Sequence, residues 1–160
     1  MLINFPKKNI ENFLFNELKI NDSQIRTSHF FDKESEKDIE FDQINSLYKI
    51  LSPKGTGSIV LDQIRAGALI KEVVLILSFD EEYGDVVFNF PEKELLSGNK
   101  NSNELKVKAV IEYLANIKER FGIEKIRIGY EPAIDDDTCL FELSEQVFDS
   151  DNVIKKILNM

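Results

Sequence analysis

The chain has 160 residues, of which 42% are hydrophobic and 31% are charged, and its 20 basic and 29 acidic residues give a formal net charge of −9. This length and composition fit one globular domain and exclude a disordered acidic tail. No apolar run approaches the roughly 18 residues of a membrane span, and the first residues lack a signal-peptide pattern. The negative charge argues against nucleic acid or an anionic membrane as the partner, because both require a basic surface.

Histidine and cysteine are too scarce for most catalytic or metal sites. Cys139 is the only cysteine, which excludes an intrachain disulfide and indicates a reducing compartment, so we expect a cytoplasmic protein. His29 is the only histidine, so any nucleophilic relay would have to use it. We interpret Cys139 as an inert packed thiol and His29 as a surface residue. No glycine motif for phosphate and no calcium-loop spacing occurs, so we expect neither a cofactor nor a metal.

The first third of the chain predicts two helices separated by a polar stretch. Pro6 can begin a helix, and apolar residues then recur at helical spacing at Ile10, Phe13, Leu14 and Leu18. Residues 21–40 are polar and predict no regular element. A second short helix is expected from Asp42, with apolar residues at Ile44, Leu47, Tyr48 and Leu51. Proline and glycine in residues 52–57 end it.

The middle of the chain predicts a β-hairpin. Residues 58–71 fit either a strand or a helix, and this alternative stays open. Residues 73–79 are continuously apolar and β-branched, which is typical of a central strand covered on both faces. Residues 80–85 predict a hairpin loop in which Gly84 supplies a positive φ. A return strand follows over residues 86–90 and ends at Pro91.

The last part of the chain predicts a long helix, two strands and a short helix. The helix spans residues 102–121, with Asn101 or Ser102 as its N-cap and Gly122 as its left-handed C-cap. Strands are expected over residues 123–131 and 138–143. A terminal helix begins near Asp149. The pattern of two hairpins joined through a helix predicts a single α+β domain over residues 1–160, with a small, mainly antiparallel sheet and helices packed on it.

The acidic residues are concentrated in two predicted loops. No lysine or arginine occurs between Lys71 and Lys93, or between Arg127 and Lys155. We name residues 80–85 the first acidic loop and residues 131–138 the second acidic loop. They are either solvated connections or a negative surface that attracts a basic partner. Under the second interpretation the partner-binding residues, including two tyrosine anchors, are Asp80, Glu81, Glu82, Tyr83, Asp85, Tyr130, Glu131, Asp135, Asp136 and Asp137.

Two segments carry a resemblance to a known class of proteins. Residues 78–91, SFDEEYGDVVFNFP, and residues 129–133, GYEPA, together with the size and acidity of the chain, resemble bacterial immunity proteins of polymorphic and contact-dependent toxin systems. The resemblance implies a non-enzymatic protein that binds and neutralises a cognate toxin domain in the cytoplasm. Such a toxin often attacks nucleic acid and is therefore basic. The resemblance to immunity proteins implies no catalytic residue in this chain.

Two other functions remain alternatives from the sequence. A small acidic regulatory protein or nucleic-acid mimic that inhibits a basic partner would share the charge argument. A carboxylate- and metal-dependent hydrolase would use the acidic loops as ligands, although three consecutive aspartates at 135–137 project in different directions.

Overall fold

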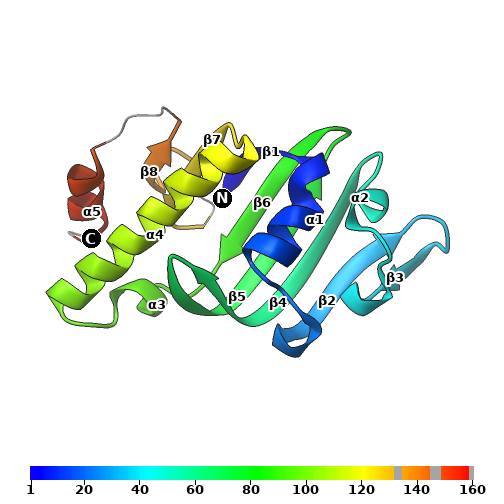
Figure 1. The fold of residues 1–160 in the computed structure, drawn as a ribbon, viewed down its shortest axis with the longest axis horizontal. Coiled ribbons are helices and arrows are strands. Elements are labelled where there is room, and N and C mark those ends of the chain that lie inside the picture. Colours follow the sequence, from blue (N-terminus) through cyan, green and yellow to red (C-terminus); the bar gives the residue numbers. More distant parts are fainter. Residues whose placement is uncertain (132–134, 145–148, 159–160) are drawn as a thin grey trace.

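A computed structural model describes residues 1–131, 135–144 and 149–158 of the chain. Figure 1 shows α1 and α4 in front of its strands. In these residues the strands are β1 (Leu2–Pro6), β2 (Ile25–Asp32), β3 (Lys37–Ile39), β4 (Gly55–Ala66), β5 (Ala68–Phe79), β6 (Tyr83–Asn89), β7 (Lys125–Gly129) and β8 (Cys139–Leu143). The helices are α1 (Ile10–Asn12), which continues through a π-turn at Phe13–Glu17, α2 (Leu47–Ile50), α3 (Lys93–Leu96), α4 (Lys100–Phe121) and α5 (Ser150–Leu158).

The described strands form one antiparallel eight-stranded sheet in the order β3-β2-β4-β5-β6-β1-β7-β8. The helices that the structure describes lie on one face of it (Figure 1). We name the opposite side the open face. The predicted α+β class and antiparallel sheet are confirmed.

The central strand β5 shows why one face is open. Its side chains alternate, so that Leu75 and Leu77 are fully buried under the helices. Val74 and Ile76 point to the open face and are only half-buried. The prediction of a central strand was correct, but its coverage on both faces was wrong. The continuous apolar run of β5 therefore leaves aliphatic side chains on an exposed surface.

The ambiguous segment 58–71 is a strand, a turn and another strand. β4 and β5 pair from Gly55↔Phe79 to Ala66↔Ala68, and Gly67 makes the turn with a φ of +76°. A Cβ on Gly67 would overlap the Ala109 carbonyl of α4, so the turn packs directly against that helix. Helical spacing in this segment reflects coincidence rather than structure.

The polar stretch 21–40 contains the β2–β3 hairpin, which the sequence did not predict. Phe30 is fully buried and packs its ring where Gly57 of β4 has no side chain. Ser28 is buried because its hydroxyl donates to Glu40 Oε2 (2.5 Å) and accepts from the backbone N–H of Phe41 (2.7 Å). One buried position of β2 is therefore occupied by a polar residue, Ser28, and this hid the alternation of the strand.

The first strand was also missed. β1 hydrogen-bonds to β6 on one side and to β7 on the other. Leu2 and Phe5 are fully buried, and the Phe5 ring packs against Phe13 and Phe121 with centroid distances of 5.1 and 6.1 Å. The helical turns that follow residue 6 agree with the prediction.

The sequence did not predict α3, and the other remaining helices agree with the predictions, with two differences. α2 is one turn long and covers only Leu47–Ile50. α4 begins two residues earlier than predicted, because the Asn99 side chain accepts from the Ser102 N–H at 2.9 Å. Gly122 ends α4 with a φ of 67°, as predicted. Asp149 caps α5, whose buried residues pack against α4 in a cluster of Val107, Ile111, Val153, Ile154 and Ile157.

The role predicted for Gly84 was wrong. Gly84 lies inside β6, opposite Phe79, and the positive-φ glycines of the described chain are Gly67 and Gly122. A Cβ at position 84 would overlap the Ser78 carbonyl oxygen and the Phe79 ring. Glycine is needed here for space and not for its backbone conformation.

We expect Gly84→Ala to lower the free energy of unfolding by about 3 kcal/mol, the upper range for overpacking a close contact. The matched control is Gly122→Ala, which meets nothing nearer than Pro6 at 3.9 Å and should cost about 1 kcal/mol from left-handed backbone strain. Urea denaturation of both variants measures the difference. Equal losses would show that the approach at Gly84 is not tight.

Candidate functional site

The first acidic loop is the turn between β5 and β6, and lysines lie beside it. The Asp80 N–H donates to the Tyr83 carbonyl at 2.9 Å, which closes the turn. Lys54 Nζ lies 3.5 Å from Asp80 Oδ1. The Lys7 N–H donates to the Glu82 carbonyl at 2.8 Å, so this lysine also belongs to the same end of the sheet. The loop has no basic neighbour in sequence but has basic neighbours in space.

Lys7 itself is a buried cation at this end. Its Nζ donates to the Pro53 carbonyl at 2.8 Å, and the Tyr48 ring lies 5.8 Å away. Burial has the largest effect in lowering the pKa of Lys7, and the charge of Lys33 lowers it further. Lys33 donates to the Ser52 carbonyl at 3.1 Å. Three lysines therefore offset part of the negative charge that the sequence assigned to the first acidic loop.

The second acidic loop connects β7 and β8, and its described residues are ordered by backbone hydrogen bonds. The Tyr130 N–H donates to the Thr138 carbonyl at 3.0 Å, and the Cys139 N–H donates to the Asp135 carbonyl at 3.0 Å. The Tyr130 hydroxyl donates to Glu92 Oε1 at 3.1 Å, so Tyr130 reaches across to the segment that follows β6. Tyr130 is 46% exposed.

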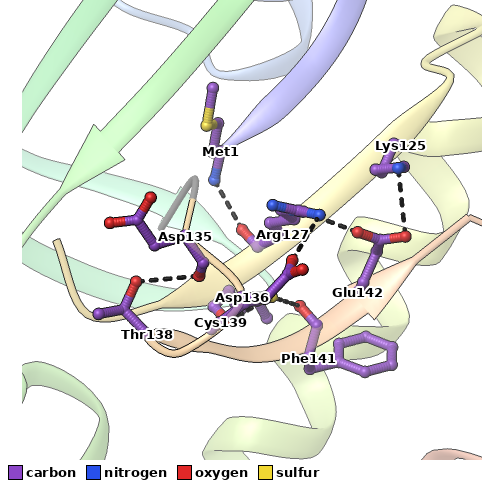
Figure 2. Close-up of polar contacts among 10 residues, drawn as sticks. Met1, Lys125, Arg127, Asp135, Asp136, Thr138, Cys139, Phe141 and Glu142 are labelled. Atoms are coloured by element: carbon purple, nitrogen blue, oxygen red, sulfur yellow. Dashed lines mark hydrogen bonds and ion pairs between the residues drawn. The ribbon is translucent and has the colours of Figure 1, made fainter. Parts of the chain in front are cut away.

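Arg127 offsets part of the negative charge near the second acidic loop. Its guanidinium donates to Glu142 Oε2 at 2.7 Å and lies 3.3 Å from Asp136 Oδ1, as Figure 2 shows. Lys125 lies 3.3 Å from the other oxygen of Glu142. The hydrogen bond from Arg127 lowers the pKa of Glu142, and the same bond raises the pKa of Arg127. Asp136 is therefore a partner of Arg127 and not a free acid.

The two acidic loops lie at opposite ends of the sheet. β1 finishes beside the first acidic loop, because Pro6 pairs with Tyr83. β7 runs antiparallel to β1 and so leads away from that end. The second acidic loop follows β7 and lies at the far end. The sequence-predicted residues thus form two separate groups: Asp80, Glu81, Glu82, Tyr83 and Asp85 at one end, and Tyr130, Glu131, Asp135, Asp136 and Asp137 at the other.

An apolar cavity lies beside the second group, and the sequence analysis missed it. β1 spans only Leu2–Pro6, so the last residues of β6 and β7 have no strand between them. A cavity of about 250 Å³ lies there, beneath α4. Its lining includes side chains of the open face and of α4, among them Ile76, Val87, Asn89, Val110, Tyr113 and Leu114. Predicting this cavity would have required recognising that β1 is a short strand buried between β6 and β7.

Tyr113 adds one polar group to this apolar lining. Its hydroxyl is buried and makes no hydrogen bond to the residues described by the structure. Burial, and after it the nearby Glu17 carboxylate, raise the pKa of Tyr113. Glu17 is itself held by Arg120 at 2.8 Å.

The remaining candidates do not form a reactive constellation. His29 is exposed on β2, with its Nε2 3.3 Å from Asp38 Oδ1. Cys139 is half-buried on β8, and its thiol lies 3.4 Å from the Phe141 carbonyl. Within residues 1–131, 135–144 and 149–158 no three histidine, cysteine or acidic side chains gather as metal ligands. Nor does any helix in those ranges have the length and apolarity to cross a membrane.

Comparisons with known proteins identify the family. A family model described as PABL017 Cdi1I immunity protein matches residues 1–146, so the chain belongs to this family of immunity proteins. A chain of the solved structure of the toxic C-terminal tip of CdiA from Pseudomonas aeruginosa in complex with immune protein has the same fold. It aligns with a TM-score of 0.58 and 18% identity over 88% of this chain and 90% of that chain. No curated protein matches. The resemblance to immunity proteins is confirmed.

The Glu142–Arg127 pair predicts a pH dependence of stability. Because the pKa of Glu142 is lowered from its ordinary 4.5 in the folded state, its contribution is present above pH 4.5 and is lost as the pH falls below that value. Glu142→Gln should lower the free energy of unfolding by about 1 kcal/mol at pH 7. That difference from wild type should shrink below pH 4.5, measured by urea denaturation across pH 3–7.

The matched control is Glu104→Gln, which removes an exposed carboxylate on α4 and should change stability by less than about 0.5 kcal/mol. A difference between wild type and Glu142→Gln that stays constant down to pH 3 would contradict a stabilising Glu142 carboxylate.

Proposed function

We propose that this immunity protein binds and neutralises a CdiA-type C-terminal toxin domain. The observation that carries the proposal is the family match over residues 1–146. The shared fold with a chain of a CdiA toxin–immune complex supports it. The function is tested by expressing the cognate toxin domain in a sensitive host. Co-expression of this chain should restore growth and yield a stable 1:1 complex, and the absence of both would refute it.

Neutralisation in our proposal occurs by binding in the cytoplasm and not by catalysis. His29 contacts Asp38 on an exposed strand, and Cys139 lies against backbone carbonyls. Among the described residues, no hydroxyl or thiol nucleophile forms a hydrogen bond with the His29 side chain, and no histidine or other base forms one with the Cys139 thiol. These placements support an inhibitor that covers a toxin surface.

The end of the sheet that contains the second acidic loop is our proposed contact surface. It presents the half-exposed Tyr130 together with the exposed carboxylates of Glu131, Asp135 and Asp137. At the first acidic loop, by contrast, Lys54 pairs with Asp80, and Lys7 and Lys33 lie at the same end of the sheet. A partly exposed tyrosine beside acids suits a basic partner, because aromatic anchors supply affinity and the charges speed association. A toxin domain that acts on nucleic acid would be such a partner.

We expect His29→Ala to neutralise the toxin domain as well as wild type does. The side chain is largely exposed and its one ion-pair partner, Asp38, is exposed too. Surface substitutions of this kind change stability by less than about 0.5 kcal/mol. Growth of the co-expressing host measures the outcome. Loss of protection by folded His29→Ala protein would reveal a catalytic or direct binding role for this residue.

Charge reversal at the two ends of the sheet tests the contact surface. The triple variant Glu131→Lys, Asp135→Lys and Asp137→Lys should slow association with the toxin domain by about tenfold at low salt. Raising the salt concentration should slow wild-type association more than that of the variant, because screening acts over about 8–10 Å. Asp136 is left unchanged, since it pairs with Arg127. Surface-binding kinetics give the rates.

The matched control is Asp80→Lys, Glu81→Lys and Glu82→Lys, which reverses three charges at the opposite end of the sheet. The association rate of this control should stay within about threefold of wild type. The proposed contact surface lies farther from the three reversed charges than the screening length. If this control slows association more than the other triple variant does, the contact surface is at the first acidic loop instead.

A further inference from the structure

The apolar cavity between β6 and β7 lies at the end of the sheet assigned to partner binding. Its lining includes Val87 and Asn89 near the end of β6, and Ile128 and Glu131 on the side of β7. Val87 and Asn89 are half-buried and belong to the open face. The cavity therefore opens toward solvent and is not sealed within the core.

The surroundings of this opening are acidic. Glu131 is part of the lining, and Tyr130 next to it donates to the carboxylate of Glu92 across the opening. The described residues Asp135 and Asp137 follow on the same loop. Arg127 is engaged by Glu142 and Asp136. Met1 also lines the cavity, its amino group donates to the Arg127 carbonyl at 2.8 Å, and burial lowers the pKa of that amino group to about 6. An apolar hollow with a negative rim is complementary to an apolar side chain that stands between basic residues.

Such a hollow has a clear energetic use in binding. Affinity in protein interfaces comes from a few large side chains that fill desolvated pockets near the centre of the contact, whereas charged rims mainly speed the encounter. A volume of about 250 Å³ has room for one large aliphatic or aromatic side chain. The aliphatic side chains Val87 and Ile76 continue the apolar surface outward from the opening.

We propose that the cavity receives a large apolar side chain of the toxin domain, presented on a basic segment. This inference rests on the proposed function and names the anchor point within it. The toxin segment lies across the ends of β6 and β7. Its apolar side chain enters beside Val87, and its basic residues face Glu131 and the second acidic loop.

The test fills the opening. Val87→Trp places a large side chain at the opening, and Asn89→Phe does so from the next position on the same face. Each should accelerate dissociation of the cognate toxin domain by about 30-fold, the effect of losing one anchor. Val60→Phe is the matched control, because Val60 is a half-buried valine of the open face on β4 that does not line the cavity. It should dissociate at the wild-type rate.

Thermal melting confirms that each variant is folded before its kinetics are compared. If the wild-type chain binds the toxin domain and both filling variants dissociate at the wild-type rate, the cavity is not an anchor site. Equal losses in the filling variants and in Val60→Phe would also overturn it, since the toxin would then cover the whole open face. Failure of the wild-type chain to bind the toxin domain would instead refute the proposed function itself.

Discussion

The first strand lies in the interior of the sheet, where it hydrogen-bonds to β6 on one side and to β7 on the other. No other strand of the described chain joins the β2–β6 part of the sheet to the β7–β8 hairpin. Phe5 fixes this strand by packing against the rings of Phe13, in the π-turn after α1, and Phe121, at the end of α4. Because β1 is short, it closes the sheet only partway along its neighbours. The cavity beneath α4 lies where β1 begins, beyond Leu2, so the same strand that completes the core also creates the proposed anchor site.

The elements with strong local patterns were predictable from the sequence. The long α4 has an apolar stripe and a glycine cap, and β5 is a continuous β-branched run, so both local patterns agree with the final structure. β1 and β2 were not predictable, because their burial depends on partners far along the chain. The Ser28 hydroxyl is buried only because Glu40 and Phe41 satisfy it, and Leu2 is buried only because two distant strands flank it.

The candidate site was predictable as a set of residues but not as a surface. Sequence alone showed two base-free acidic segments, but it could not show that the strand order separates them. Nor could it show that Lys54 reaches Asp80, or that Arg127 holds Asp136 and Glu142. Charge clusters in sequence are therefore poor measures of local electrostatic potential, since antiparallel pairing brings distant cations beside them. The apolar cavity had no counterpart in any local pattern, because its walls come from separate strands and a helix.

Amide hydrogen exchange of the chain, alone and in complex with its cognate toxin domain, tests the central claim most directly. The account predicts slowed exchange in residues 87–92 and 127–131, which surround the cavity, and unchanged exchange in residues 80–83 at the other end of the sheet. Backbone amides in a docked interface exchange more slowly because local opening is suppressed. Protection confined to residues 80–83, or to the β2–β3 hairpin, with no change around the cavity would contradict the account.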